Sequence, residues 1–266
     1  MKKFFSVFLC MSLIVCIFAG CSSKVDNGNK GDGNNKSSSS ASDLDCFEII
    51  DGQLIGLTEK GAKKKELVIP ESVTSVKGWV FAPKYISEGL LNETLEKVSF
   101  ENPNCKLLSG TFVGCITLTE VLLPQNLDTI PDLCFQLDEK LTEIIIPDTV
   151  TSVGELAFDK CHSLKNVKFG ESLISIGEKA FSECTSLKTL EFQEGLESIG
   201  DYAFADCKSI TSVTLPQSVT SIEAGAFSNA YDKESEYKIV VHKGSWADTN
   251  FDSYKSGDEN VQKVYA

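Results

Sequence analysis

The sequence predicts a repeat solenoid, a strand-dominated α/β stack of short coils with a cap at each end. Its apolar residues recur every 23 residues without a gap, in copies that begin at Leu95, Leu118, Leu141, Leu164, Leu187 and Ile210. A partial copy, ELVIPESVTSVKGWVF, precedes them at 66–81. One copy is too small to bury its own apolar side chains, so consecutive copies must stack on one another.

Within one copy the apolar residues form three short segments. In the copy that begins at Leu164, Val167 and Phe169 alternate with polar residues, which predicts a strand with one buried face. Leu173 and Ile176 mark a second short extended segment, and residues 178–181 have room for one helical or 3-10 turn only. Stacking places equivalent strands about 4.8 Å apart, in a parallel sheet with a continuous core behind it.

The N-terminus has the pattern of an export signal. MKK is positively charged, and the apolar run FFSVFLCMSLIVCIFA has the length of a signal-peptide core. That run is short for a membrane-spanning helix, which needs roughly 20 apolar residues. It ends in FAGC, which resembles a bacterial lipoprotein signal that is cleaved before Cys21, whose thiol then carries diacylglycerol. An ordinary cleaved signal followed by a chance cysteine is the alternative.

The remaining segments follow in a consistent order. Residues 1–20 are the expected signal peptide, and 21–43 are rich in Ser, Asn and Gly, as a flexible tether is. In 44–65, two apolar runs flank Asp51 and Gly52, which predicts a β-hairpin that caps the first coil. The repeats occupy 66–236. Residues 237–266 form the C-terminal cap, and its β-branched run at 239–241 predicts a last strand.

The repeat pattern, LxxVxF followed by VTSIG and xxAFxxCxSL, resembles the BspA-type leucine-rich repeats of bacterial surface proteins over about 66–230. The resemblance implies a curved solenoid with a parallel β-sheet on its concave face. Short strands and helical or 3-10 turns would then form the other side. It also implies a non-catalytic interaction module, because members of the family are often described as adhesins or as binders of host and microbial proteins.

The overall charge excludes two classes of partner. The chain has 266 residues and a formal net charge of −13, so no basic stripe is available for nucleic acid or anionic lipid. We therefore expect contact with a membrane only through the lipid on Cys21. Two histidines and no CxxC pair argue against a metal site, and no motif indicates a cofactor.

One triplet, Asp159–Cys161–His162, has the residue types of a catalytic site. Cys161 recurs at Cys115, Cys184 and Cys207, while Asp138 and Ala230 fill the same position in other copies. A catalytic cysteine would be singular, so this cysteine is expected to pack in the core. The residues equivalent to His162 and Asp159 share no chemistry, which predicts no catalytic residue here.

The cysteine count gives a second expectation. Of ten cysteines, Cys10 and Cys16 leave with the signal and Cys21 takes the lipid, which leaves seven. An odd number in an exported protein requires at least one free thiol. Stacked cysteines have side chains that run side by side, which is poor geometry for a disulfide, so we expect reduced packing thiols.

The exposed face of the predicted sheet carries the main candidate for binding. Its outward residues form two columns: Lys97, Glu120, Glu143, Asn166, Thr189 and Ser212, and Ser99, Leu122, Ile145, Lys168, Glu191 and Thr214. Leu122 and Ile145 are apolar where the column is otherwise polar, and Glu120, Glu143 and Lys168 surround them. An exposed apolar patch with charged neighbours often marks a contact. β-propensity on a solvent face, or cover by the linker, is the alternative.

An insertion at 82–93 is the second candidate. Phe81 and Leu95 are eight residues farther apart than the regular copies require, and the extra residues include Tyr85 and Ile86. Insertions in solenoids lie in surface loops and can bind partners. The alternative is a loop that folds back over its neighbours.

Together these features predict a lipid-anchored protein of the bacterial cell envelope whose globular part is extracellular. The expected partner is a host-matrix or microbial surface protein. Glycan capture and a structural role in the envelope are the alternatives. A glycosidase that uses Glu120 and Glu143 is disfavoured, because these residues lie on an open sheet and flank no pocket.

Overall fold

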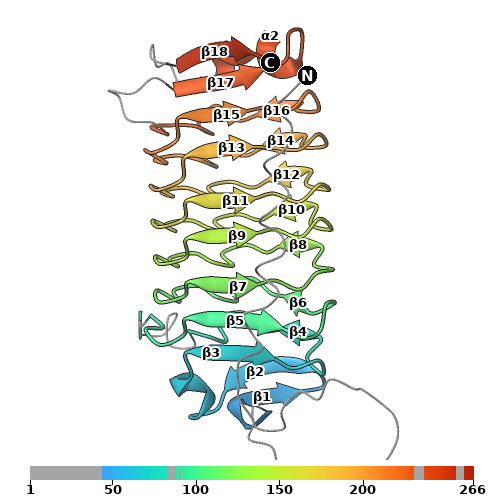
Figure 1. Cartoon of the computed structure of the whole chain (residues 1–266), viewed down its shortest axis with the longest axis vertical. Coiled ribbons are helices and arrows are strands. Elements are labelled where there is room, and N and C mark those ends of the chain that lie inside the picture. The colour runs from blue at the N-terminus through green and yellow to red at the C-terminus, as the bar shows by residue number, and fades with distance from the viewer. Residues whose placement is uncertain (1–43, 83–87, 90, 231–236, 256–260) are drawn as a thin grey trace, which may run out of the picture. The chain divides into compact units, whose positions relative to one another are not determined.

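The computed structural model describes residues 44–82, 88–89, 91–230, 237–255 and 261–266. They belong to one compact unit, Ser39–Ala266. Within it, successive coils stack along a single axis, so the predicted solenoid is confirmed (Figure 1). In these ranges no helix is both long and apolar enough to cross a membrane.

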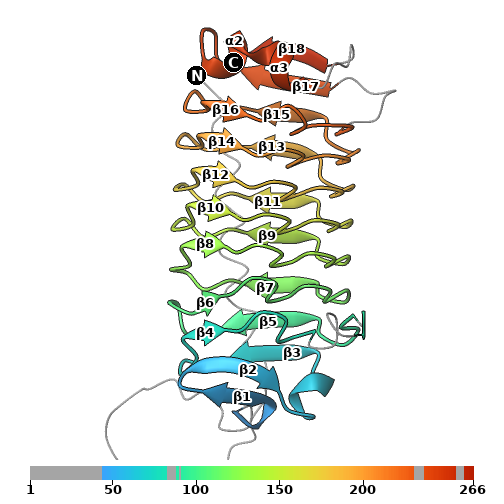
Figure 2. The ribbon, with the colours of Figure 1, turned by 180° about the vertical axis from the view of Figure 1, so that it is seen from behind.

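Each coil contributes one strand to each of two columns, which Figures 1 and 2 show from opposite sides. We call the first column the long-strand sheet: β3 (Glu66–Ile69), β5 (Lys97–Phe100), β7 (Glu120–Leu122), β9 (Glu143–Ile145), β11 (Asn166–Lys168), β13 (Thr189–Glu191), β15 (Ser212–Thr214) and β17 (Tyr237–Val241). The second is the short-strand sheet: β4 (Ser75–Val76), β6 (Lys106–Leu107), β8 (Thr129–Ile130), β10 (Ser152–Val153), β12 (Ser175–Ile176), β14 (Ser198–Ile199) and β16 (Ser221–Ile222).

The strands pair in parallel, and equivalent residues of the repeat face one another. Asn166 of β11 pairs with Glu143 of β9, and Ser175 of β12 pairs with Ser152 of β10. The middle residue of a long strand, such as Ile144, points into the core. This register follows from the repeat, because a slip by one residue would move every apolar side chain to the solvent side.

Strand pairing is interrupted on both sides of coil 118–140. Over the described residues, the long-strand sheet is divided into β3–β5–β7, β9–β11 and β13–β15–β17–β18, so β7 is not paired with β9. In the short-strand sheet, β8 is paired with β10 but not with β6. Coil 118–140 is therefore joined to each neighbour by only one of its two strands.

A column of turns supplies a third set of bonds between coils. The backbone N–H groups of Phe158 and Lys160 donate to the carbonyls of Ala180 and Ser182 in the next coil, at 2.7 and 2.8 Å. Leu156 and Lys160 have positive φ values of 56° and 61°. Because a right-handed helix needs negative φ throughout, these segments are hydrogen-bonded turns and not the helical or 3-10 turns that the sequence predicts.

The core is organised around a column of stacked phenylalanine rings. Adjacent ring centroids lie 4.9–5.6 Å apart with interplanar angles of at most 10°. The column consists of Phe81, Phe112, Phe135, Phe158, Phe181, Phe204 and Phe227, all buried. The repeat places one ring at the equivalent position of each coil, and each ring buries its faces against the rings of the coils on either side.

A β-hairpin closes the N-terminal end. β1 (Phe47–Ile50) and β2 (Gln53–Leu57) are antiparallel and joined through Asp51 and Gly52, both at positive φ. β2 pairs with β4, which places the hairpin against the first coil. The short 3-10 helices η1 (Leu44–Cys46) and η2 (Gly61–Lys63) flank it.

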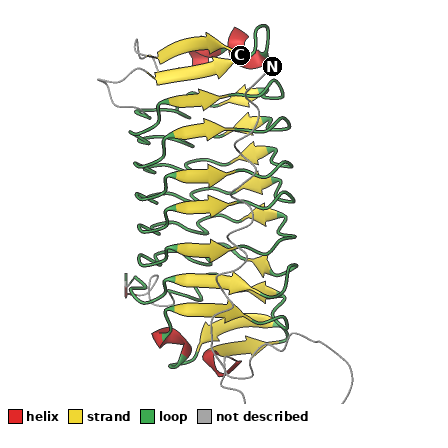
Figure 3. Cartoon of the chain, viewed as in Figure 1, coloured by secondary structure: helices red, strands yellow, loops and turns green. Residues whose placement is uncertain are grey.

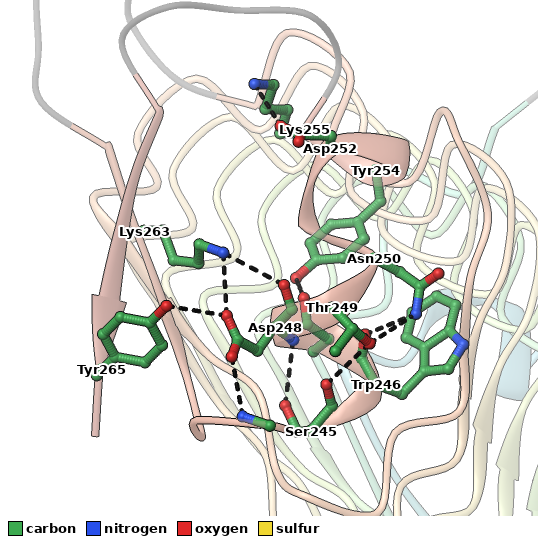
Figure 4. A network of polar contacts seen from close by, with 12 residues as sticks. Ser245, Trp246, Asp248, Thr249, Asn250, Asp252, Tyr254, Lys255, Lys263 and Tyr265 are labelled. Carbon is green, nitrogen blue, oxygen red and sulfur yellow. Dashed lines mark hydrogen bonds and ion pairs between the residues drawn. The ribbon is translucent and has the colours of Figure 1, made fainter.

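The C-terminal end is closed by α2 (Trp246–Thr249), α3 (Phe251–Tyr254) and β18 (Val261–Tyr265), shown at the top of Figure 3. β18 adds a parallel strand after β17 and is held by Asp248 (Figure 4). The Asp248 carboxylate accepts hydrogen bonds from the Gly244 N–H at 2.9 Å, the Lys263 ammonium at 3.0 Å and the Tyr265 hydroxyl at 3.1 Å. The same hydrogen bonds lower the pKa of Asp248.

We expect Phe158→Ala to destabilise the solenoid by about 3–5 kcal/mol, because a cavity would open between two stacked rings. Urea unfolding followed by circular dichroism measures this loss. Thr189→Ala, on the solvent side of β13, is the control and should change stability by less than about 0.5 kcal/mol. Equal losses in the two variants would contradict the role given to the ring column.

We expect Lys160→Gly to stabilise the protein by up to about 1 kcal/mol, since relief of left-handed strain exceeds the added entropy of the unfolded chain. Gly114 already occupies the equivalent position, at φ 70°. Lys165→Gly is the control, because Lys165 is also exposed but has no positive φ. This variant should have a free energy of unfolding about 0.5–1 kcal/mol lower than that of the parent. The same denaturation measurement applies, and a loss in Lys160→Gly would contradict the strain argument.

Candidate functional site

The long-strand sheet presents its outward side chains in two columns. Pairing places Glu120 beside Lys97 and Leu122 beside Ser99, and farther along it places Ile145 beside Lys168. β7 and β9 lie side by side in both views and contact each other, although they are not paired (Figures 1 and 2). Leu122 and Ile145 are therefore neighbours across this unpaired seam.

Both apolar side chains of the seam are open to solvent. Leu122 is 38% exposed and Ile145 is 54% exposed, whereas Val121 and Ile144, which precede them in the strands, are buried. Val68 of β3, 37% exposed, stands in the same column and is separated from Leu122 by Ser99. We call Leu122 and Ile145 the seam patch.

The charges around the seam patch are mixed and accessible. The Glu120 carboxylate lies 3.3 Å from the Lys97 ammonium, and both side chains are more than a third exposed. Such a surface ion pair contributes little to stability. Glu143 and Lys168 are also exposed. Because Glu120 already faces a lysine and neither glutamate is enclosed, the pair lacks the setting of a glycosidase acid and nucleophile.

The triplet Asp159–Cys161–His162 is not assembled into a site. Cys161 is fully buried, and its thiol donates to the Phe135 carbonyl at 3.1 Å. Asp159 accepts a hydrogen bond from the Gln136 amide at 2.9 Å. The His162 ring is at the surface, 3.9 Å from Glu183. The three side chains thus have separate partners, as expected if Cys161 belongs to the core.

The cysteines of the described chain are all buried, and no disulfide joins any two of them. The thiols of Cys161, Cys184 and Cys207 each donate to a phenylalanine carbonyl of the preceding coil, at 3.0–3.2 Å. Burial raises the pKa of the Cys105 thiol to about 11 and that of Cys161 well above its usual range. Since the thiolate is the reactive form, these cysteines lack the environment of a nucleophile.

Two candidate sites remain, a metal site and the insertion at 82–93. Within the described ranges, no group of three or more His, Cys, Asp and Glu side chains is placed to hold a metal ion. Tyr85 and Ile86, the candidates in the insertion at 82–93, lie outside the described residues.

Comparison with known proteins identifies the family. The family model described as BspA type leucine-rich repeat region matches residues 60–138 and 128–239, which is more than half of the chain. The chain belongs to the BspA-type leucine-rich repeat family. None of the curated proteins compared with this BspA-type chain matches it.

Solved structures similar to this BspA-type protein are bacterial leucine-rich repeat proteins. One, from T. pallidum, shares 22% identity over 71% of this chain and 63% of its own, with a TM-score of 0.38. A leucine-rich cell surface protein from Faecalibacterium prausnitzii shares 18% identity over 76% of this chain and 79% of its own (TM-score 0.41). A leucine-rich repeat protein from Eubacterium ventriosum shares 19% identity over 55% of this chain and 44% of its own (TM-score 0.43). The chain spans less than two thirds of the T. pallidum protein.

Sequence reasoning missed two features of this BspA-type chain. Val68 extends the apolar positions of the sheet face, and an alignment of the partial copy at 66–81 with the other copies would have found it. Asp138 is fully buried. The signal for its burial was present, because it fills the position that cysteines occupy in four other copies.

We expect the thiols of the folded protein to resist alkylation. In a chain without its first 21 residues, N-ethylmaleimide at about pH 6 should leave all seven cysteines unmodified, because each is buried and out of reach of the reagent. Mass spectrometry after addition of urea should then show seven modifications. Fast modification of Cys161 in the folded protein would revive the catalytic hypothesis.

Proposed function

We propose that this protein is a non-catalytic interaction module of the bacterial cell envelope that binds an extracellular protein through the long-strand sheet. The partner is a host-matrix or microbial surface protein. Export, cleavage before Cys21 and lipid attachment at its thiol would hold the module at the envelope, with the solenoid outside. The observation that carries the proposal is the exposure of Leu122 and Ile145 on adjacent strands.

The seam patch has the properties of a contact centre. Two aliphatic side chains stand next to each other on strands, which hold side-chain positions more firmly than loops do. Burying such side chains contributes about 25 cal/mol per Å² of apolar area removed from water. Glu143 and Lys168 lie beside them and would remain at the rim of an interface. This arrangement, an apolar centre with a polar rim, is typical of protein–protein contacts.

The physical setting of the same face argues against an enzyme. Glu120 and Glu143 lie on a sheet that is open to solvent, whereas catalysis needs groups that are held around a substrate and partly shielded from water. The triplet around Cys161 offers no such arrangement. Membership of a leucine-rich repeat family agrees with an interaction role. The insertion at 82–93, with Tyr85 and Ile86, remains the second proposed binding segment.

We expect a chain without its first 21 residues to bind at least one protein in a panel of matrix and bacterial-surface proteins. Leu122→Lys/Ile145→Lys should weaken that binding by at least about tenfold, which corresponds to about 1.4 kcal/mol. Surface plasmon resonance measures the affinities, after circular dichroism has shown that the variant folds.

Thr189→Lys/Ser212→Lys is the matched control, because it adds the same two positive charges at paired outward positions of β13 and β15. Equal weakening in both double variants would show a charge effect and remove the seam patch from the proposal. Unchanged binding in both would move the site, first to the insertion at 82–93. Binding to a glycan array but to no protein would overturn the protein-binding proposal in favour of glycan capture.

A further inference from the structure

Coil 118–140 differs from the other coils in both chemistry and pairing. Within the described residues it lacks one strand pairing with each neighbour, β6–β8 and β7–β9, whereas the one other missing pairing between coils is β11–β13. It also replaces two core residues of the repeat: Cys134 stands where most copies have alanine, and Asp138 stands in the cysteine column. A buried carboxyl group and two interrupted sheets therefore coincide in one coil.

Asp138 is enclosed without a full set of partners. Its side chain is completely buried, between Cys115 of the preceding coil and Cys161 of the following coil. Oδ1 accepts a hydrogen bond from the Cys115 N–H at 2.8 Å. Oδ2 is buried and has no hydrogen-bond partner. The carboxyl group thus has one donor where an ionised, solvated carboxylate would have several.

The groups that face Asp138 do not balance a negative charge. The side chains that interact with it electrostatically are the thiols of Cys115 and Cys161 on the neighbouring coils and of Cys134 on its own coil. The nearby carboxyl group of Asp159, bonded to Gln136, adds negative charge to this region. Burial raises the pKa of Asp138 well above its usual range, and the hydrogen bond from Cys115 opposes this rise only in part.

We propose that coil 118–140 is a pH-responsive junction of the solenoid: it is closed while Asp138 carries a proton and opens when that proton is lost. An unpaired buried charge is far more costly than a neutral acid in the same place, so ionisation favours local opening that admits water. The adjoining coils carry Cys115 and Cys161 at this position, and each keeps three of its four strand pairings, whereas coil 118–140 keeps two. The cost of ionisation therefore falls on the least paired coil.

The sign of the pH dependence follows from proton binding. In the unfolded chain an aspartate loses its proton at about pH 3.9. In the closed coil the proton is retained to a higher pH, so the closed state binds more protons than the open state. Stability of the coil therefore falls as pH rises above about 4, and continues to fall until the pKa of the closed state has been passed.

If the seam patch is the binding site, which rests on the proposed function, the same proton regulates binding. Leu122 belongs to coil 118–140, and Ile145 lies across the seam in the next coil. Opening of the coil would separate the two halves of the patch. Binding through the patch is then expected to weaken at alkaline pH.

Hydrogen exchange measured by mass spectrometry tests the junction without reference to any partner. The chain without its first 21 residues contains the whole compact unit Ser39–Ala266. Protection factors, corrected for intrinsic exchange, are compared at about pH 5.5 and about pH 8.5. Peptides from coil 118–140 should lose protection by at least roughly tenfold, because a pKa difference of one unit between the closed and open states changes the opening equilibrium by that factor. Peptides from coil 187–209 should keep their protection.

Two substitutions at position 138 should abolish the loss. Asp138→Cys restores the residue of the column, and Asp138→Asn keeps the shape without the charge, so one remains informative if the other misfolds. Glu139→Gln removes an exposed carboxylate next to Asp138 in the same coil and should leave the wild-type response intact. The proposal is overturned if coil 118–140 keeps its protection at high pH, or if the loss persists in a folded variant at position 138.

Binding is measured separately, so the two proposals can fail independently. pH-dependent opening with no protein partner would sink the proposed function and leave the junction standing. Binding through the seam patch with constant protection would overturn the junction alone.

Discussion

Each coil of this protein can bury its apolar side chains only against the coils on either side, and this dependence governs the rest of the structure. Three sets of backbone hydrogen bonds and the stacked phenylalanine rings hold successive coils in a 23-residue register. A position in the repeat is therefore buried or exposed in the same way from coil to coil. The two end coils lack a neighbour, which is why a hairpin and the α2–α3–β18 cap close the stack.

Because of this constraint, a residue that departs from the repeat is informative. Cys161 looks chemically interesting beside His162, but it repeats through the column and makes the same thiol–carbonyl contact as Cys184 and Cys207. Asp138 looks ordinary in sequence, but it is a carboxyl group in a buried cysteine position. In a repeat protein, an unusual residue is therefore recognised by comparison with the equivalent positions of the other copies. Comparison with its neighbours in the chain does not reveal it.

Much of the architecture could be predicted for the same reason. Period and alternation identify the strands and their inward residues, such as Val121 and Ile144, because the core imposes both patterns. The turns were harder, since neither Leu156 nor Lys160 is of a residue type that favours positive φ. The trace lies in the equivalent positions of other copies, which include Gly114, Asp206 and Asn229. β18 was missed because VQKVY repeats no earlier copy and pairs across an intervening pair of helices. The interrupted pairing around coil 118–140 also has no signature in the alternation.

The seam between β7 and β9 connects the protein's surface with its core. Leu122 and Ile145 lie on either side of it, and Asp138 belongs to the same coil as Leu122. A partner that covers both side chains would bridge two strands that have no backbone pairing, and so would stabilise the closed coil by mass action. Proton loss from Asp138 acts on the same closed state in the opposite direction. Because linkage is reciprocal, a bound partner must also make Asp138 harder to ionise.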